Sequence, residues 1–246
     1  MSLSRQPVPD LGVVVVAAGR GERLGAGTPK AFVHLGGMTL LEHAVLTVAS
    51  LRGPGQLVLV VPEDTADDAL QILGEAVPAG SAWQTSVVGG GRERHESVRK
   101  GLEALRDSID TVLVHDAARP LTPPEVFQRV VAEVREHRQA VVPVVPVADT
   151  IKRTDGGTTV LGTLDRSTLA AVQTPQGFPR ELLVAAHETA QARERNAPSN
   201  DAPTDDAEVV QRFGGTVRTV PGSLHSHKLS RPEDLLMLEG LLRGAE

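Results

Sequence analysis

The sequence contains no cysteine and no tyrosine, and its aromatic residues are limited to four phenylalanines and one tryptophan. The absence of cysteine excludes disulfides, thiolate metal sites and cysteine nucleophiles. It suits a protein of the reducing cytoplasm. Five aromatic rings are too few for the stacking surfaces with which proteins bind single-stranded nucleic acid.

An excess of positive charge is missing as well. The chain has 25 Lys and Arg against 31 Asp and Glu, a net charge of −6, whereas general binding to nucleic acid phosphates needs a basic surface. No apolar run approaches the roughly 18 residues of a membrane span, and the first residues, MSLSRQPVPD, lack the apolar core of a signal peptide. We therefore expect a cytoplasmic protein that binds neither nucleic acid nor membranes.

Short apolar runs alternate with helical patterns along the 246 residues. Runs typical of buried strands occur at residues 13–17, 57–61, 86–88, 112–114 and 140–145. Between them, Thr39 and Glu42 form a capping box, and Thr122 is expected to cap a helix that has Pro123 and Pro124 in its first turn. The alternation predicts a Rossmann-like α/β fold: a mostly parallel twisted sheet with helices on both faces, and ligands beyond the carboxyl ends of its strands.

Residues 147–172 interrupt this pattern. Two β-prone runs flank an Asp155-Gly156-Gly157 turn, which predicts a β-hairpin. Because the segment is too small and too polar to bury itself, we expect it to project as an arm and to pack on a second subunit. The chain is thus expected to form a single domain over residues 1–246 with a dimerisation arm at about 147–172.

The last part of the chain returns to alternating elements. Residues 191–203 are polar and are expected to form a mobile loop. Asp205 and Glu208 have the spacing that caps a short helix, and the adjacent Asp206 is interpreted as part of the same cap. A strand at 216–220 and a closing helix at 232–242 complete the prediction.

A glycine-rich segment follows the first predicted strand. It reads Ala17-Ala18-Gly19-Arg20-Gly21-Glu22-Arg23-Leu24-Gly25-Ala26-Gly27-Thr28-Pro29-Lys30. Glycine lets a backbone approach a ligand and direct N–H groups at phosphate oxygens, while Arg23 and Lys30 supply positive charge. A dinucleotide-binding motif would need glycine in place of Leu24, and a Walker loop would need Gly-Lys-Ser/Thr. The segment is either a polyphosphate-binding loop of another kind or a flexible surface loop with incidental charges.

Asp116 stands where the predicted strand at 112–114 ends. Mg²⁺ takes one or two protein carboxylates and completes its shell with water and phosphate oxygens, so Asp116 is the candidate magnesium ligand. Its alternative role is to cap the turn, and Arg119 either belongs to the site or ties this loop together. Zinc-protease spacing and a serine-hydrolase elbow are absent from the sequence.

Further motifs follow the glycine-rich segment in order. They are Gly91-x-Glu93-Arg94-x-x-Ser97-Val98, His115-Asp116-Ala117-Ala118-Arg119-Pro120, Asp149-Thr150-Ile151-Lys152, Asp165-Arg166, Gln173-Thr174-Pro175-Gln176, Thr204-Asp205-Asp206-Ala207 and Lys228-x-Ser230-x-Pro232-Glu233-Asp234. With these motifs the chain resembles, over nearly its whole length, the GT-A-like nucleotidyltransferases, and in particular the 2-C-methyl-D-erythritol 4-phosphate cytidylyltransferase family of the non-mevalonate isoprenoid pathway. The resemblance implies transfer of a cytidylyl group from CTP to a polyol phosphate, 2-C-methyl-D-erythritol 4-phosphate, with release of pyrophosphate.

The resemblance also implies roles for individual residues. Those implied for catalysis are Arg23, Lys30 and Lys228; for nucleotide binding, Ala17, Ala18, Gly19, Gly21, Gly91, Arg92 and Ser97; and for acceptor binding, Asp116, Thr150, Arg166, Thr204 and Lys228. Arg166 would arrive from the arm of the partner in a homodimer. Arg92 departs from the small or acidic residue of many relatives, and His225-Ser226-His227 before Lys228 departs from the family's usual residues.

Other interpretations stay open on the sequence. Lys30 could be a solvated lysine, and Ser97 an ordinary residue of a first helical turn. Ribitol 5-phosphate cytidylyltransferase has the same chemistry with another acceptor. A nucleotide-sugar or dinucleotide-binding module would bind without catalysis.

Overall fold

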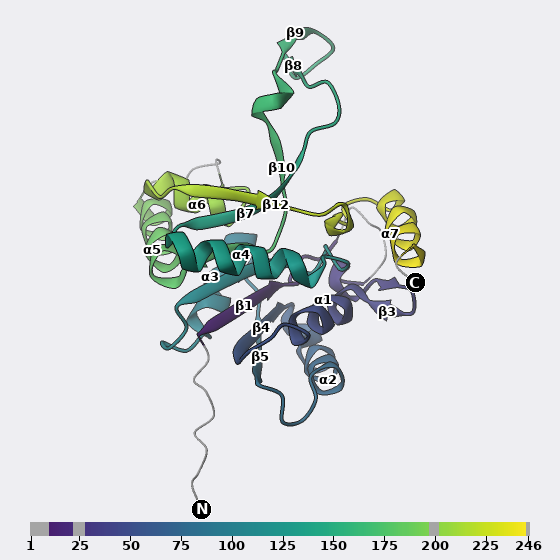
Figure 1. Cartoon of the computed structure of the whole chain (residues 1–246), viewed down its shortest axis with the longest axis vertical. Coiled ribbons are helices and arrows are strands. Elements are labelled where there is room, and N and C mark those ends of the chain that lie inside the picture. The colour runs from purple at the N-terminus through teal and green to yellow at the C-terminus, as the bar shows by residue number, and fades with distance from the viewer. Residues whose placement is uncertain (1–9, 22–27, 197–201, 245–246) are drawn as a thin grey trace, which may run out of the picture.

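A central eight-stranded sheet organises the chain (Figure 1). The computed structural model describes residues 10–21, 28–196 and 202–244. The strands of the sheet are β1 (Leu11–Val16), β4 (Gly55–Val61), β5 (Trp83–Gly89), β6 (Thr111–Asp116), β7 (Ala140–Pro146), β10 (Ala170–Val172), β11 (Gln176–Pro179) and β12 (Val217–Pro221). Their order is β10-β7-β11-β6-β1-β4-β5, and β12 also pairs with β7.

The centre of the sheet is parallel, as predicted. Strand β1 lies parallel to both β4 and β6, and β4 lies parallel to β5. Strand β11, which the sequence analysis did not identify, inserts antiparallel between β6 and β7. Valine and leucine run through β1 and β4 because both faces of these strands are covered.

Helices cover the two faces of the sheet. They are α1 (Leu40–Ala49), α2 (Ala66–Ala76), α3 (Arg94–Glu103), α4 (Pro124–His137), α5 (Arg180–Asn196), α6 (Asp206–Phe213) and α7 (Glu233–Arg243). Helices α1, α2 and α4 pack on the face that carries Val13 and Val15, whereas α3, α5 and α6 pack on the face that carries Val14. This confirms the predicted α/β fold. Leu238 of α7 packs in a smaller cluster with Leu35 of β2 (His34–Leu35), which pairs with β3 (Met38–Thr39).

Local capping signals set two of the helix starts. The hydroxyl of Thr39 accepts a 3.1 Å hydrogen bond from the Glu42 amide, which completes the predicted capping box. Asp205 likewise accepts from the Glu208 amide at 2.8 Å. The predicted Thr122 cap is wrong: Pro123 occupies the N-cap position of α4, so the Thr122 hydroxyl lies one residue too early and donates to the Arg119 carbonyl instead.

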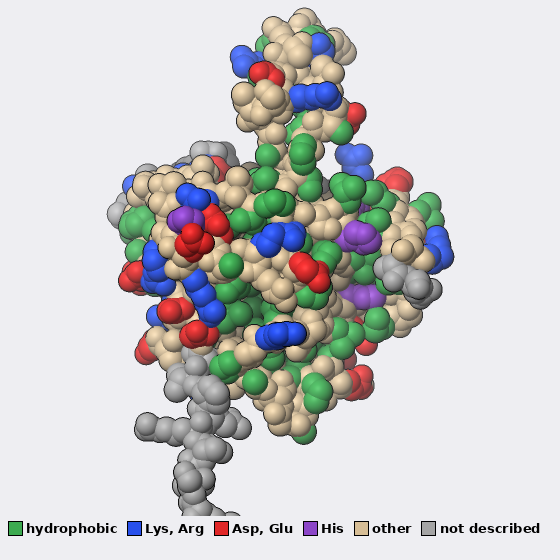
Figure 2. Space-filling model, viewed as in Figure 1, with side chains coloured by type: hydrophobic (Ala, Val, Ile, Leu, Met, Phe, Trp, Pro, Cys, Tyr) green, Lys and Arg blue, Asp and Glu red, His purple; other side chains and the backbone are tan. Residues whose placement is uncertain are grey.

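The arm projects from the sheet as a hairpin of β8 (Lys152–Thr154) and β9 (Val160–Thr163), and β10 leads back beside β7 (Figure 1). Gly156 has φ +86°, a left-handed conformation that favours glycine in this turn. Figure 2 shows that the arm stands clear of the body of the molecule. Val160 and Leu161 are 57% and 61% exposed on it. The hairpin is therefore confirmed, and its packing on a second subunit stays a prediction.

The predicted mobile loop at 191–203 is wrong for its first part. Helix α5 continues to Asn196, because alanine, arginine and glutamate in this stretch are good helix formers. Residues 197–201 lie outside the described part of the chain. Among the helices that the structure describes, none is long and apolar enough to cross a membrane.

Candidate active site

A cleft of about 1460 Å³ opens at the carboxyl ends of β1 and β6, the edge of the sheet at which an α/β fold binds its ligands. Its lining comes from the loops that follow β1, β4, β5 and β6, from α3 and from the segment before α7. Described residues of the lining include Ala17, Ala18, Gly19, Gly21, Lys30, Glu63, Gly90, Gly91, Arg92, Arg94, Ser97, Lys100, Asp116 and Lys228. Most of the residues expected to bind a nucleotide therefore lie around one cavity.

The glycine-rich segment forms one wall of this cleft. The Lys30 amide donates a 3.2 Å hydrogen bond to the Gly19 carbonyl, so the two described ends of the segment lie against each other. Gly21 has φ +68°, and a Cβ atom added there would lie 3.0 Å from Cβ of Lys30. Arg23, the other cation expected here, falls outside the described residues.

A second glycine segment, after β5, forms the opposite wall. A Cβ atom added to Gly90 would lie 2.3 Å from Cβ of Ala18, so the two segments are in close contact. The hydroxyl of buried Ser97 accepts a 3.0 Å hydrogen bond from the Gly91 amide and donates to the Glu93 carbonyl. Ser97 thereby fixes the backbone of the segment whose Gly91 and Arg92 are expected to bind the nucleotide.

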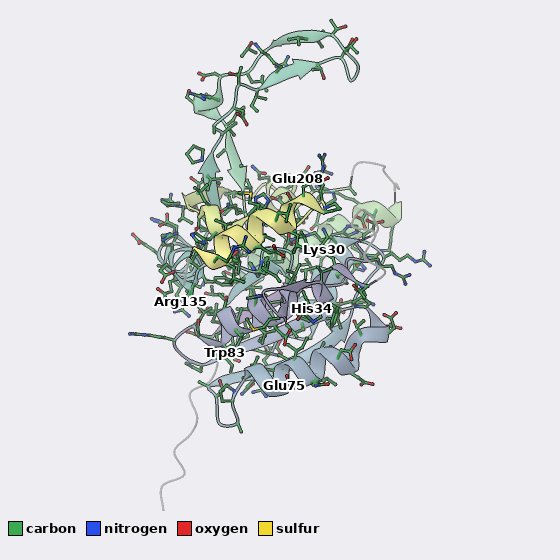
Figure 3. The ribbon with its side chains drawn as sticks, turned by 90° about the vertical axis from the view of Figure 1, so that its right-hand side faces the viewer. Lys30, His34, Glu75, Trp83, Arg135 and Glu208 are labelled. Carbon is green, nitrogen blue, oxygen red and sulfur yellow. The ribbon has the colours of Figure 1, made fainter. Side chains whose placement is uncertain are left out.

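Lys30 links the first wall to the segment that carries Lys228. Its Nζ donates a 3.0 Å hydrogen bond to the Leu229 carbonyl, in the segment before α7 (Lys30 is labelled in Figure 3). The Leu229 amide in turn donates to the Ala118 carbonyl at 2.8 Å. Lys30, Asp116 and Lys228, which are distant in the sequence, thus line the same cleft.

Asp116, the last residue of β6, contacts two cations. Its Oδ1 accepts from Nε and Nη2 of Arg94 at 3.2 and 3.1 Å, and its Oδ2 accepts from Nζ of Lys228 at 2.7 Å. Burial alone would raise the pKa of this carboxyl, but the positive charges of Arg94 and Lys228 outweigh burial and hold the pKa far below its usual range. The Asp116 carboxylate is therefore ionised.

A second cavity, of about 170 Å³, adjoins the first. Arg94, Asp116 and Lys228 line both cavities and form the wall between them. Thr204 lines the smaller cavity, and its hydroxyl donates to Oε2 of Glu208 at 2.9 Å.

Thr150 and Arg166, the other two residues expected at the acceptor, are exposed on the arm and line neither cavity. Nη1 of Arg166 donates to the Ala148 carbonyl. The structure of one chain therefore brings Asp116, Thr204 and Lys228 together and leaves Thr150 and Arg166 apart from them.

The sequence analysis missed the role of Arg94. As the first residue of α3, it places a cation where the helix dipole disfavours one, and this was a usable signal for a carboxylate partner. Asp206, interpreted as part of a helix cap, is fully buried instead, and its Oδ2 accepts from Nη1 of Arg94 at 2.7 Å. The Asp205 carboxylate caps α6, so the Asp206 side chain is not needed at the cap and points toward the protein interior.

Arg119 ties the loop together, as one of its two interpretations predicts, and it also lines the small cavity. Its guanidinium donates to the Ser226 carbonyl at 2.7 Å and to the Val172 carbonyl at 3.2 Å. It thereby joins the base of the arm to the segment that precedes Lys228.

A glycine-walled cationic cleft thus lies at the carboxyl edge of a mostly parallel sheet, with a smaller cavity beside it. The family match places this α/β protein among the nucleotidyltransferases. Residues 11–244 match the family model IspD, 2-C-methyl-D-erythritol 4-phosphate cytidylyltransferase. The chain belongs to this family.

Individual relatives agree with the family model. The chain is 45% identical over 242 residues to a 2-C-methyl-D-erythritol 4-phosphate cytidylyltransferase of Rhodococcus opacus, covering 98% of each chain. It is 47% identical over 234 residues to a bifunctional IspD/IspF enzyme of Clavibacter michiganensis, covering 95% of this chain and 55% of that protein. The crystal structure of 4-diphosphocytidyl-2C-methyl-D-erythritol synthase from Anaerococcus prevotii superposes with a TM-score of 0.81 at 27% identity, covering 96% of both chains.

Proposed function

We propose that this chain transfers the cytidylyl group of CTP to 2-C-methyl-D-erythritol 4-phosphate, which yields 4-diphosphocytidyl-2-C-methyl-D-erythritol and pyrophosphate. The observation that carries the proposal is the wall of Arg94, Asp116 and Lys228 between a large and a small cavity. A nucleoside triphosphate in the cleft and a phosphomonoester in the small cavity would meet at this wall. The reducing cytoplasm, which suits a chain without cysteine, is the proposed place of the reaction.

The proposal assigns the cleft to CTP. Backbone groups of Ala17, Ala18, Gly19 and Gly21 would contact the triphosphate, with Arg23 and Lys30 as the cations that neutralise charge on the α-phosphate and on departing pyrophosphate. Backbone groups of Gly91 and Arg92, held by Ser97, would contact the cytosine edge. The support for this assignment is that every described member of the set lines the cleft.

The proposal assigns the small cavity to the acceptor. Asp116, Thr204 and Lys228 of one chain would bind 2-C-methyl-D-erythritol 4-phosphate, and Thr150 and Arg166 would reach it from the arm of a partner. A guanidinium can hold a phosphomonoester through two parallel hydrogen bonds and so align it for attack. The exposed arm is compatible with a homodimer in which each arm completes the other chain's site.

The proposal includes Mg²⁺ at Asp116. The carboxylate is ionised and lines the cleft, and the hydrogen bond from Lys228 occupies one of the two lone pairs of Oδ2. These features fit an ion that takes one protein carboxylate and otherwise water and phosphate oxygens. When bound, Mg²⁺ would withdraw charge from the phosphate oxygens of CTP.

In the proposed reaction a phosphate oxygen of the acceptor forms a bond to the α-phosphorus while the bond from that phosphorus to the β-phosphate oxygen breaks. The attacking oxygen is already an anion, so no general base and no covalent enzyme intermediate are required. The chain's own residues align the two phosphates and hold positive charge where negative charge develops. Lys30 stands on the CTP side of the wall and Lys228 on both sides.

Pyrophosphate release tests the proposal. The enzyme is incubated with CTP, Mg²⁺ and either 2-C-methyl-D-erythritol 4-phosphate or ribitol 5-phosphate. We expect release with the first acceptor and at least ~100-fold less, at equal concentration, with the second. Preferential turnover of ribitol 5-phosphate, or binding of CTP with no turnover of either acceptor, would overturn the proposal.

A further inference from the structure

Five side chains, two cations and two carboxylates in alternation followed by a histidine, connect the proposed acceptor site to the protein interior. Nζ of Lys228 donates to Oδ2 of Asp116 at 2.7 Å, and Arg94 contacts Oδ1 of Asp116 at 3.1 Å and Oδ2 of Asp206 at 2.7 Å. Oδ1 of Asp206 lies 3.2 Å from Nε2 of His187. These residues come from the segment before α7, from β6, α3, α6 and α5, so the array ties five parts of the chain together.

The array has one exposed end and one buried end. The Lys228 side chain is 40% exposed and sits at the cavities, whereas the Asp206 side chain is 1% exposed and His187 4%. Asp206 is also held through its neighbours, because Gln176 donates to the Asp205 carboxylate at 2.8 Å and accepts from the Ala207 amide at 3.1 Å. The buried Asp206 therefore holds Arg94 in place, whereas the exposed side chain of Lys228 can turn toward a ligand.

Arg94 makes contacts that a point charge could not make together. Its Nε and Nη2 face one carboxylate while its Nη1 faces another, an arrangement that depends on the planar fork of a guanidinium. As a result Asp116 has a second cation besides Lys228. If Lys228 turns from Asp116 to an incoming phosphate, the buried Asp116 carboxylate stays paired with Arg94 and is not left uncompensated.

We infer that Arg94 is a positioning residue that keeps Asp116 neutralised and thereby releases Lys228 to bind the phosphate of the acceptor. Asp206, backed by His187, holds the guanidinium in place. The inference rests on the proposed function, because it assigns a phosphomonoester to the small cavity. Without Arg94, Asp116 would retain Lys228, and the acceptor phosphate would have to compete with that carboxylate.

Replacing Arg94 alone would leave Asp206 as a buried charge, so the test uses Asp206→Asn as the background. Arg94→Met/Asp206→Asn is compared with Asp206→Asn and with Arg94→Lys/Asp206→Asn. We expect the KM for the acceptor to rise about tenfold or more in the Met variant and to be largely restored in the Lys variant. Relative to Asp206→Asn, the KM for CTP and the kcat at saturating acceptor should change less than about threefold in both double variants.

Each departure from this result counts against the inference. An unchanged acceptor KM in the Met variant overturns it, as does an equal increase in both KM values, which would indicate a general structural defect. An acceptor KM that is as high in Arg94→Lys/Asp206→Asn as in Arg94→Met/Asp206→Asn also overturns it. Wild-type enzyme that releases no pyrophosphate overturns the proposed function instead. The inference is then decided by calorimetric affinity for inorganic phosphate, expected to be about tenfold weaker in the Met variant than in Asp206→Asn, with equal affinity contradicting it.

Discussion

Nζ of Lys228 and Oδ2 of Asp116 lie 2.7 Å apart, although the two residues are separated by 112 positions in the sequence. This ion pair sits in the wall shared by the large cleft and the small cavity. A phosphate that enters the small cavity therefore meets a lysine that already has a partner. We therefore expect the strength of the Asp116–Lys228 ion pair to influence the affinity for the proposed acceptor.

Lys30→Ala is expected to lower kcat at least ~100-fold, the effect of losing one fixed charge beside a reacting phosphate. The measurement is steady-state pyrophosphate release with saturating CTP and acceptor. Arg52→Ala, which removes an exposed positive charge from the turn after α1, serves as the control and should leave kcat unchanged. Near-wild-type turnover of Lys30→Ala would contradict the assigned role.

Gly90→Ala is expected to weaken CTP binding at least ~10-fold, because the added Cβ would lie 2.3 Å from Cβ of Ala18 and force the two glycine walls apart. Calorimetric titration with CTP measures the effect. Gly74→Ala in α2 adds the same methyl group where no atom lies within 4 Å, so it should leave CTP affinity unchanged. Equal affinities of the two variants would argue against a nucleotide between these walls.

Mixed dimers test whether the arms are exchanged. If Arg166 acts in the partner's site, a dimer of Arg166→Ala and Lys30→Ala chains has one intact site, since one chain supplies Lys30 and the other supplies Arg166. When equal amounts of the two inactive variants are mixed at random, about half of the dimers contain one chain of each kind, and one of the two sites in each such dimer is intact. The mixture should then regain about a quarter of the activity of the same amount of wild-type enzyme. A mixture as inactive as its components would show that Arg166 does not act across a dimer.

Buried His115 is expected to make the stability of the fold depend on pH in mild acid. Burial lowers the pKa of His115 to about 4, and its Nδ1 lies 3.1 Å from the Thr174 hydroxyl. Between pH 6.5 and 4 the unfolded chain binds a proton that the folded chain does not, so the free energy of unfolding falls as pH falls through this range. From pH 7 to pH 5 the contribution is about 2 kcal/mol.

Urea unfolding at pH 7 and pH 5 measures this contribution. His115→Asn keeps a hydrogen-bonding group for Thr174 without a titrating ring, so the variant should lose about 2 kcal/mol less than the wild type between the two pH values. Equal losses in the two proteins would mean that His115 does not titrate differently on folding.

The capping box gives a prediction for stability alone. Thr39→Ala removes the acceptor of the Glu42 amide and should lower the free energy of unfolding by about 1 kcal/mol, with kcat and both KM values unchanged. Ser50→Ala, at the other end of α1, removes an exposed hydroxyl and should cost less. Equal destabilisation by the two changes would contradict the cap.

The parts of the fold that depend on neighbouring residues could be predicted from the sequence. Apolar runs identified the parallel strands, and the Thr39–Glu42 and Asp205–Glu208 pairs identified helix starts. Strand β11 escaped prediction because Gln-Gly-Phe-Pro has no strand pattern of its own and is held between β6 and β7 by tertiary pairing.

The residues of the site also divide into those that a local sequence pattern identifies and those that only tertiary packing brings together. The glycine walls and Asp116 could be recognised because each follows a predicted strand directly. The contact of Arg94 with Asp206 joins residues 112 positions apart, and no local pattern relates them. Only the packing of α3 against the sheet beside α5 and α6 brings the arginine between its two carboxylates.

The most direct test of the account is a crystal structure of the enzyme with CTP and Mg²⁺. The account predicts the triphosphate against residues 17–21, the α-phosphate within hydrogen-bond distance of Nζ of Lys30, and the cytosine at Gly91 beside Ser97. CTP bound elsewhere, with Lys30 and Asp116 both remote from its phosphates, would contradict it.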